Sequence, residues 1–227
     1  MLASSRRRIR ERLRDSDVVL DVGGWASPFE RADWVIDLQP YATRGRYDYD
    51  RAAAHERFSE RTWVRRDVCD HDPWPFADGQ FDFAVCAQTL EDVRDPVWVC
   101  RELCRVARAG YVEVPSRLEE QSLGVHGPWI GWSHHRWLCD VSDGRIEFVA
   151  KPHLLHARAS DHFPAGFHAT LTPEERVAQL WWEGSFEYGE RVFFEAAELD
   201  AYLADFVAAH RPGPPGRGPL RRLLGRA

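Results

Sequence analysis

Carboxylate and glycine residues follow two short apolar runs near the start of the chain, in the stretch VVLDVGGWASPFERADWVIDLQP at residues 18–40. The first run leads into Asp21, Gly23 and Gly24, and the second run ends at Asp37. Glycine lets a backbone approach a ligand closely, and a carboxylate at a strand tip can accept two hydrogen bonds from a ribose diol. These residue types and their spacing therefore predict a site for a nucleotide-like ligand.

A parallel sheet is needed to bring these residues to one edge. Apolar runs predict strands near 17–21, 34–37, 63–67, 81–87 and 111–115. Helices are predicted over 5–15, 47–60 and 96–108, with Gly110 as the stop of the last one. Strands that alternate with helices favour an α/β fold, a Rossmann-like doubly wound sheet whose ligands lie outside the carboxyl ends of the strands.

The pattern changes after Pro115, which predicts a divergent C-terminal addition. We expect a strand over 145–149, helices over 174–182 and 196–210, and an edge strand over 191–194. The predicted divisions are a basic N-terminal helix (1–16), a core (17–116), a C-terminal half that covers the site (117–210) and a disordered basic tail (211–227).

Three pieces in order carry a family resemblance over residues 17–116. They are LDVGG with Asp37 after it, RRDVCDHDPWPFADGQFDFAVCAQTLEDVRDP, and RELCRVARAGYVEVPS. With these pieces the chain resembles class I S-adenosylmethionine-dependent methyltransferases, in particular the type 11 group. The resemblance implies the class I methyltransferase fold and S-adenosylmethionine as cofactor.

The resemblance also implies roles for single residues. It assigns Gly23 and Gly24 to the methionine moiety and Asp21 to the support of their loop or to a water-mediated contact. The remaining cofactor-binding residues that it implies are Asp37 at the ribose, Leu38 on the adenine face, Asp67 and Val68 at the adenine edge, and Ala87 and Gln88 near the methyl group.

One residue departs from the family pattern. Trp25 stands where the family commonly has another glycine, so the indole either lines the cofactor site or blocks it. A blocked site would favour a non-catalytic binding or scaffold protein on the same fold. A hydride-transferring dinucleotide enzyme is a further alternative, although it would want the fuller G-x-G-x-x-G motif.

The acceptor chemistry is predicted after the fifth strand, in the segment GPWIGWSHHRW at residues 127–137. His134 and His135 are the predicted catalytic residues, because an oxygen or nitrogen acceptor often needs a general base. The alternative is a packed loop whose imidazoles and indoles hydrogen-bond locally.

A metal-dependent enzyme that uses the His-rich segment 126–168 is also an open alternative. Seven of the ten His lie between residues 117 and 170. The spacing of His134, His135 and Cys139, or of His153 and His156, matches no standard zinc pattern. Adjacent residues of a strand point to opposite faces, so we expect no metal site.

Composition narrows the partners. Residues 1–14 and 211–227 each carry a net charge of +5, which leaves −16 on the remainder of a chain of net charge −6. An acidic body argues against nucleic acid as a substrate, and the basic ends are expected to be solvated. The five Cys are expected to be free thiols in a reducing compartment.

We therefore expect a cytoplasmic enzyme that methylates a small-molecule acceptor on oxygen or nitrogen, such as a sugar or a natural-product intermediate. No nucleic-acid partner and no membrane association are expected. The sequence leaves the acceptor and the oligomeric state open.

Overall fold

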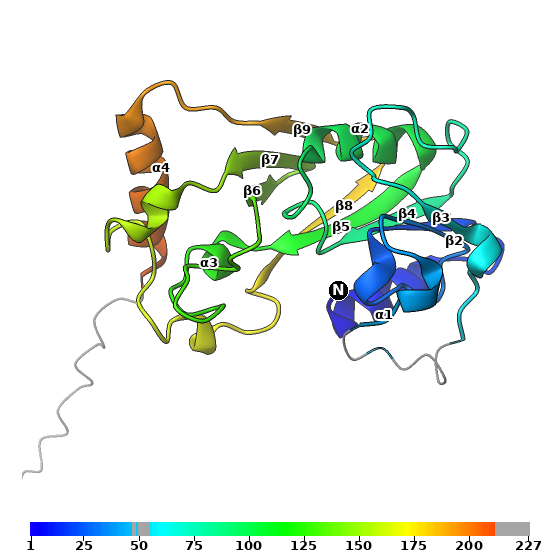
Figure 1. Ribbon diagram of the computed structural model, residues 1–227, viewed down its shortest axis with the longest axis horizontal. Coiled ribbons are helices and arrows are strands. Elements are labelled where there is room, and N and C mark those ends of the chain that lie inside the picture. Colours follow the sequence, from blue (N-terminus) through cyan, green and yellow to red (C-terminus); the bar gives the residue numbers. More distant parts are fainter. Residues whose placement is uncertain (47–48, 50–54, 212–227) are drawn as a thin grey trace, which may run out of the picture.

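The computed structural model describes residues 1–46, 49 and 55–211 (Figure 1). Its main sheet has six strands in the order β3-β2-β1-β4-β5-β8. Their bounds are β1 Val19–Val22, β2 Trp34–Asp37, β3 Trp63–Arg65, β4 Phe83–Ala87, β5 Ala109–Pro115 and β8 Val177–Glu183. The first five strands run parallel and β8 pairs antiparallel with β5. The predicted doubly wound α/β fold is confirmed.

Helices cover both faces of this sheet. The α-helices are α1 Ala3–Arg12, α2 Pro96–Val106, α3 Arg117–Glu120 and α4 Ala196–His210. Alternate residues of β1 explain the two layers: Leu20 and Val22 pack in the cluster that contains Leu103 of α2, whereas Val19 packs with Ile9 of α1. This alternation follows the two-residue period of a strand.

A smaller sheet lies beside the main one in the C-terminal half. It consists of β6 Trp137–Ser142, β7 Arg145–Ala150 and β9 Glu187–Glu190, in the order β6-β7-β9. In Figure 1 this sheet lies between the main sheet and α4, which stands at the opposite end of the molecule from β2 and β3. Among the described residues, we find no helix with the length and apolarity that crossing a membrane requires.

The helix predicted over 174–182 is wrong, because the chain forms β8 there. Seven register pairs join β8 to β5, from Ala109 with Glu183 to Pro115 with Val177. Leu180 and Trp182 are buried on one face and pack in the cluster of α2. The residue types also suit a strand, since aromatic and β-branched side chains fit a pleated surface.

Gly110 does not end α2, contrary to the prediction. The helix ends at Val106, and Gly110 lies inside β5. A Cβ built on Gly110 would lie 2.6 Å from the carbonyl oxygen of Ala84 and 2.6 Å from the ring of Trp182. Glycine is needed here because β8 places an indole directly against the strand.

Two further elements differ from the sequence predictions. Residues 47–48 and 50–54 of the predicted helix 47–60 lie outside the described residues, and residues 55–59 are not helical. The predicted edge strand 191–194 is wrong, because the strand is β9, four residues earlier. The predicted helices near 5–15, 96–108 and 196–210 are confirmed as α1, α2 and α4. The predicted tail lies outside the described residues apart from Arg211.

The basic N-terminal helix packs one face against the sheet, while most of its Arg side chains are exposed. Ile9 is fully buried, and Arg6 pairs with Glu30 at 2.5 Å. The guanidinium of Arg8 lies 4.7 Å from the centre of the Trp181 ring. The positive charge of α1 therefore stabilises the contact of this helix with the sheet.

Candidate active site

The carboxyl ends of the parallel strands border a cavity of about 600 Å³. Residues that follow β1, β2, β3, β4 and β5 line it, and Trp132, His134 and His135 line it from the C-terminal half. This is the edge at which ligands bind to open α/β sheets, and the volume falls in the usual range for small-molecule sites.

The glycine turn after β1 is built for close packing. Gly23 has φ +75°, and its N–H donates to the carbonyl oxygen of Ile36 at 2.9 Å. A Cβ at Gly23 would lie 2.2 Å from Oγ1 of Thr89, and one at Gly24 would lie 2.1 Å from Oδ2 of Asp21. A side chain at either glycine would therefore clash with a neighbouring residue. The pattern of strands in the sequence does not reveal this requirement.

Asp21 supports this turn from inside the protein. Its Oδ2 accepts a hydrogen bond from the backbone N–H of Phe29 at 2.7 Å. Burial raises its pKa to about 6, against the opposing effects of that N–H and of the Arg6 charge. Asp21 borders a smaller cavity of about 240 Å³ next to the main one.

Asp37 lies in the main cavity at the tip of β2. Its Oδ2 accepts from the N–H of Trp25 at 3.0 Å and its Oδ1 from the N–H of Gln39 at 2.7 Å. Burial raises its pKa, and the two N–H groups oppose that shift. Each carboxylate oxygen keeps a further acceptor position, so the group is oriented and still able to bind a hydroxyl.

Trp25 lines the cavity and leaves it open. The indole Nε1 donates to the carbonyl oxygen of Thr43 at 2.9 Å and lies 3.0 Å from its Oγ1. This anchor holds the ring as a wall of the 600 Å³ cavity.

Of the residues predicted to bind the adenine, two line the main cavity and one does not. Leu38, which is 57% exposed, and Val68 line the main cavity. Asp67 does not line it, and its carboxylate forms an ion pair with Arg94. Its Oδ1 also accepts from the N–H of Cys69 at 2.9 Å.

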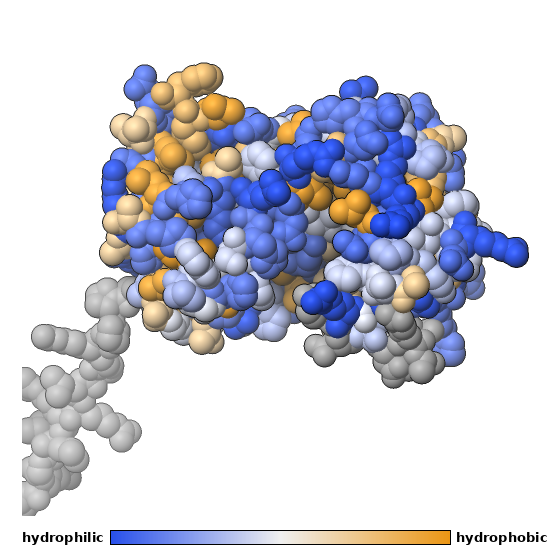
Figure 2. Space-filling view, in the orientation of Figure 1, coloured by the Kyte–Doolittle hydropathy of each residue, from blue (hydrophilic) through white to orange (hydrophobic). Residues whose placement is uncertain are grey.

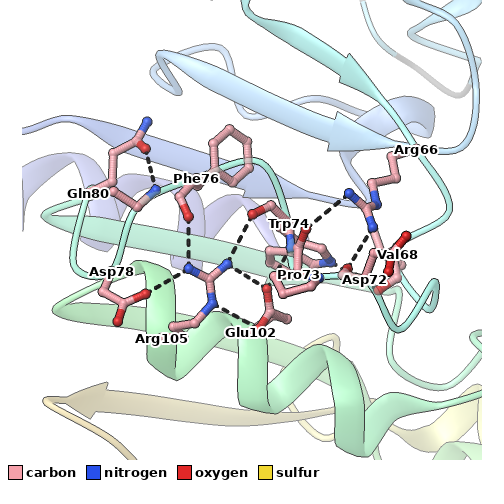
Figure 3. A network of polar contacts seen from close by, with 11 residues as sticks. Arg66, Val68, Asp72, Pro73, Trp74, Phe76, Asp78, Gln80, Glu102 and Arg105 are labelled. Atoms are coloured by element: carbon pink, nitrogen blue, oxygen red, sulfur yellow. Dashed lines mark hydrogen bonds and ion pairs between the residues drawn. The ribbon is translucent and has the colours of Figure 1, made fainter.

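A network of polar contacts holds the loop that carries Val68 (Figure 3). The indole Nε1 of Trp74 donates to the carbonyl oxygen of Val68 at 3.0 Å, and the backbone N–H of Trp74 donates to Oε2 of Glu102 of α2 at 2.8 Å. Arg105 of α2 donates to the carbonyl oxygens of Trp74 and Phe76 and pairs with Glu102. One turn of α2 thus fixes this wall of the cavity.

The backbone is strained where β4 meets the cavity. Gln88 has φ +55°, a conformation that non-glycine residues adopt rarely and often at functional sites. Its N–H donates to the carbonyl oxygen of Glu113 at 2.8 Å. Ala87 and Gln88 both border the smaller cavity, and Gln88 lines the main one as well.

Glu91 is a site residue to which the sequence pointed only weakly. It is 1% exposed and lines the main cavity. Its two carboxyl oxygens have no hydrogen-bond partner among the described residues. Burial raises its pKa well above the ordinary value, because a buried carboxylate loses its hydration. The position of Glu91 just after a predicted strand was the one feature of the sequence that indicated a site residue.

The segment after β5 brings two imidazoles to the cavity. His135 is nearly buried, and its Nδ1 lies 2.6 Å from Oε1 of Glu120, which is 1% exposed. Glu120 also pairs with Lys151 at 2.6 Å. His134 lies next to His135, with ring centres 4.6 Å apart. Glu120 therefore orients His135, one of the two predicted catalytic residues. The sequence alone did not predict this contact.

The other His of this segment are spread around these two. The ring centre of His126 lies 6.0 Å from that of His134. His153 and His156 line a neighbouring cavity of about 210 Å³, which shares Trp132 and His135 with the main cavity. His168 pairs with Glu119 at 2.6 Å. Cys139 is buried in the core cluster of α2.

Part of the chain matches a known family model. Residues 36–112 match the family model described as a methyltransferase domain. No curated protein matches the chain. Among solved structures it is similar to a SAM-dependent methyltransferase from Aquifex aeolicus, at 20% identity and a TM-score of 0.35, over 48% of this chain and 62% of that one.

Two other solved structures are similar. The YcgJ protein from Bacillus subtilis shares 17% identity over 51% of this chain and 52% of its own, with a TM-score of 0.40. A SAM-dependent methyltransferase from Thermotoga maritima shares 19% identity over 54% of each chain, with a TM-score of 0.34. The chain thus spans little more than half the length of these proteins. The match of residues 36–112 to the methyltransferase-domain model agrees with the resemblance found in the sequence.

Proposed function

We propose that this protein transfers a methyl group from S-adenosylmethionine to a small-molecule acceptor. The observation that carries the proposal is the 600 Å³ cavity at the carboxyl ends of the strands, with Asp37 and the Gly23 turn at its border. It adjoins the segment that matches the methyltransferase-domain family.

The residues present fit the cofactor. Asp37 would bind the ribose hydroxyls with its remaining lone pairs, and Leu38 and Val68 would enclose the adenine ring. Asp67 would reach the adenine amino group only by sharing its carboxylate with Arg94.

The two cavities beside the glycine turn suit the methionine part. Gly23 and Gln88 border both of them, and Gly24, Asp21 and Ala87 border the smaller one. A cavity of about 240 Å³ that is bordered by the glycine turn and by a buried carboxylate suits an amino-acid group.

The acceptor would enter from the C-terminal half. S-adenosylmethionine supplies a methyl group on a sulfonium, which an oxygen or nitrogen of the acceptor attacks while the C–S bond breaks. Trp132 lines the cavity and would help to exclude water, and His134 and His135 are the groups that would face the acceptor. Glu91, whose pKa burial raises, lines the same cavity and would offer its carboxyl group to the acceptor.

The acidic body supports a small neutral or cationic acceptor rather than a nucleic acid. Residues 15–210 carry a net charge of −16. Such a surface repels phosphate backbones, so we propose neither a nucleic acid nor a membrane as partner. We also propose a cytoplasmic location for the protein.

Labelled methyl transfer tests the proposal. The purified protein is incubated with methyl-labelled S-adenosylmethionine and a cell extract, which is then separated into small molecules and macromolecules. The label is expected in the small-molecule fraction with the wild type, and in neither fraction with Asp37→Ala. Label in macromolecules would contradict the substrate class. Cofactor binding without any transfer would favour the non-catalytic alternative.

A further inference from the structure

Three side chains with metal-binding atoms meet at the acceptor end of the cavity. They are Asp92, His134 and His135, and one ligand atom from each lies within 4.8 Å of the others. All three line the main cavity. Two imidazoles and a carboxylate are a donor set that suits divalent transition-metal ions.

The two adjacent His converge because they do not lie in a strand. Residues 133 and 134 form a turn before β6, and the two imidazole planes are inclined by 77° with ring centres 4.6 Å apart. The sequence argument against adjacent ligands assumed a strand, in which neighbours point to opposite faces. A turn removes that restriction.

A buried carboxylate fixes the tautomer of His135. Glu120 Oε1 lies 2.6 Å from Nδ1, so in the neutral ring Nδ1 carries the proton and Nε2 has the free lone pair. Nε2 lies 3.9 Å from Oδ1 of Asp92, a separation that an ion between the two atoms would bridge. A carboxylate on the remote nitrogen of a metal-binding His is the usual supporting contact.

The support of the cluster is itself rigid. Glu120 is 1% exposed, and its second oxygen pairs with Lys151, whose Nζ also donates to the carbonyl oxygen of Trp132 at 2.9 Å. The N–H of Arg136 donates to the carbonyl oxygen of Glu91 at 2.7 Å. This bond joins the His turn to the loop that carries Asp92.

We propose that Asp92, His134 and His135 bind one divalent transition-metal ion at the acceptor end of the cavity. Three protein ligands leave positions open on such an ion. An acceptor hydroxyl bound there would lose its proton to water more readily, because a metal ion lowers the pKa of a bound O–H group. The acceptor class is then an alcohol or phenol; this last step rests on the proposed methyl transfer, whereas metal binding does not.

Metal titration tests the site directly. The full chain without a polyhistidine tag is stripped with a chelator and titrated with Zn²⁺ by calorimetry and with Co²⁺ by visible absorption. We expect one ion per chain in the wild type, and at least about tenfold weaker binding in His134→Ala and in Asp92→Asn. His153→Ala is the matched control, because His153 lies outside the cluster, and should bind like the wild type.

A positioning variant separates support from ligation. Glu120→Gln should bind the ion about 10–100-fold more weakly and still give the Co²⁺ spectrum, because the three ligands remain. Equal affinity in the wild type, His134→Ala and Asp92→Asn, or no stoichiometric binding by the wild type, would overturn the proposal.

S-adenosylhomocysteine binding by the metal-free protein keeps the two proposals apart. Retained binding of this product without any metal binding would overturn the metal site alone. Metal binding without binding of the product would contradict the proposed methyl transfer and leave the ion site standing.

Discussion

At the scale of single residues, Asp21 couples the glycine turn to pH. Its pKa in the folded protein is about 6, above the ordinary value of 3.8, because the carboxyl is buried. The protonated form therefore favours folding, and this contribution is lost as the pH rises from about 4 to above 6. The shift corresponds to about 3 kcal/mol.

Asp21→Asn should remove that dependence. The amide oxygen can still accept from the N–H of Phe29, and the side chain carries no charge to desolvate. We expect the free energy of unfolding of the variant, relative to the wild type, to rise by up to about 3 kcal/mol between pH 4 and pH 7. Urea denaturation at both pH values measures it, and a difference that stays constant would show that folding does not shift the pKa of Asp21.

Trp25 gives a second prediction at this scale. If the indole is a wall of the cofactor cavity, its removal takes away contact area. Trp25→Ala should then bind S-adenosylhomocysteine roughly tenfold more weakly, the equivalent of about 1.4 kcal/mol. Trp129→Ala, which removes a half-exposed indole outside this cavity, should leave the affinity unchanged. A gain in affinity in Trp25→Ala would mean that the indole blocks the site.

Local sequence patterns predicted the site residues at the strand ends but not their supports. Asp37 and Gly23 follow short apolar runs, so their position at the sheet edge could be read from the chain. Glu120 lies 15 residues before His135, and the pair arises only when the chain turns back after α3. The ion pair of Asp67 with Arg94 likewise joins two loops, and no periodicity reports such contacts.

At the scale of elements, α2 holds the loop between β3 and β4. Trp74 is 2% exposed and donates to Val68 and accepts from Arg105 (Figure 3). Trp74→Ala should lower the free energy of unfolding by about 3–5 kcal/mol, through the cavity that it leaves and the bonds that it removes. Denaturant titration measures this, and the exposed Trp129→Ala should change it by less than about 0.5 kcal/mol. A decrease in the free energy of unfolding as small as that of the control would mean that Trp74 does not stabilise the loop.

Elements were predictable where one pattern spans a whole strand or helix. The parallel strands are buried apolar runs, and α2 begins with Asp95 as a side-chain cap followed by Pro96, both readable in the sequence. The strand β8 was predicted as a helix, and its pairing with β5 joins segments more than 60 residues apart in the chain. The Trp182 ring that packs over Gly110 belongs to that same distant pairing.

At the scale of the whole molecule, the acceptor side is assembled by the C-terminal half. This half adds β8 to the main sheet, and its turn at His134 and His135 reaches the cavity. The surface over the middle of the molecule is largely hydrophilic, and apolar residues gather over α4 and the segments beside it (Figure 2). In this half the predictions near 145–149 and 196–210 are confirmed as β7 and α4, whereas the helix predicted over 174–182 is wrong.

The central claim is that the cavity at the carboxyl edge binds S-adenosylmethionine, and calorimetric titration with S-adenosylhomocysteine tests it most directly. The account predicts one site per chain in the wild type and loss of binding in Asp37→Ala. Asp205→Ala, on α4 and far from the cavity lining, should bind like the wild type. No binding by the folded wild type, or equal binding by Asp37→Ala, would contradict the account.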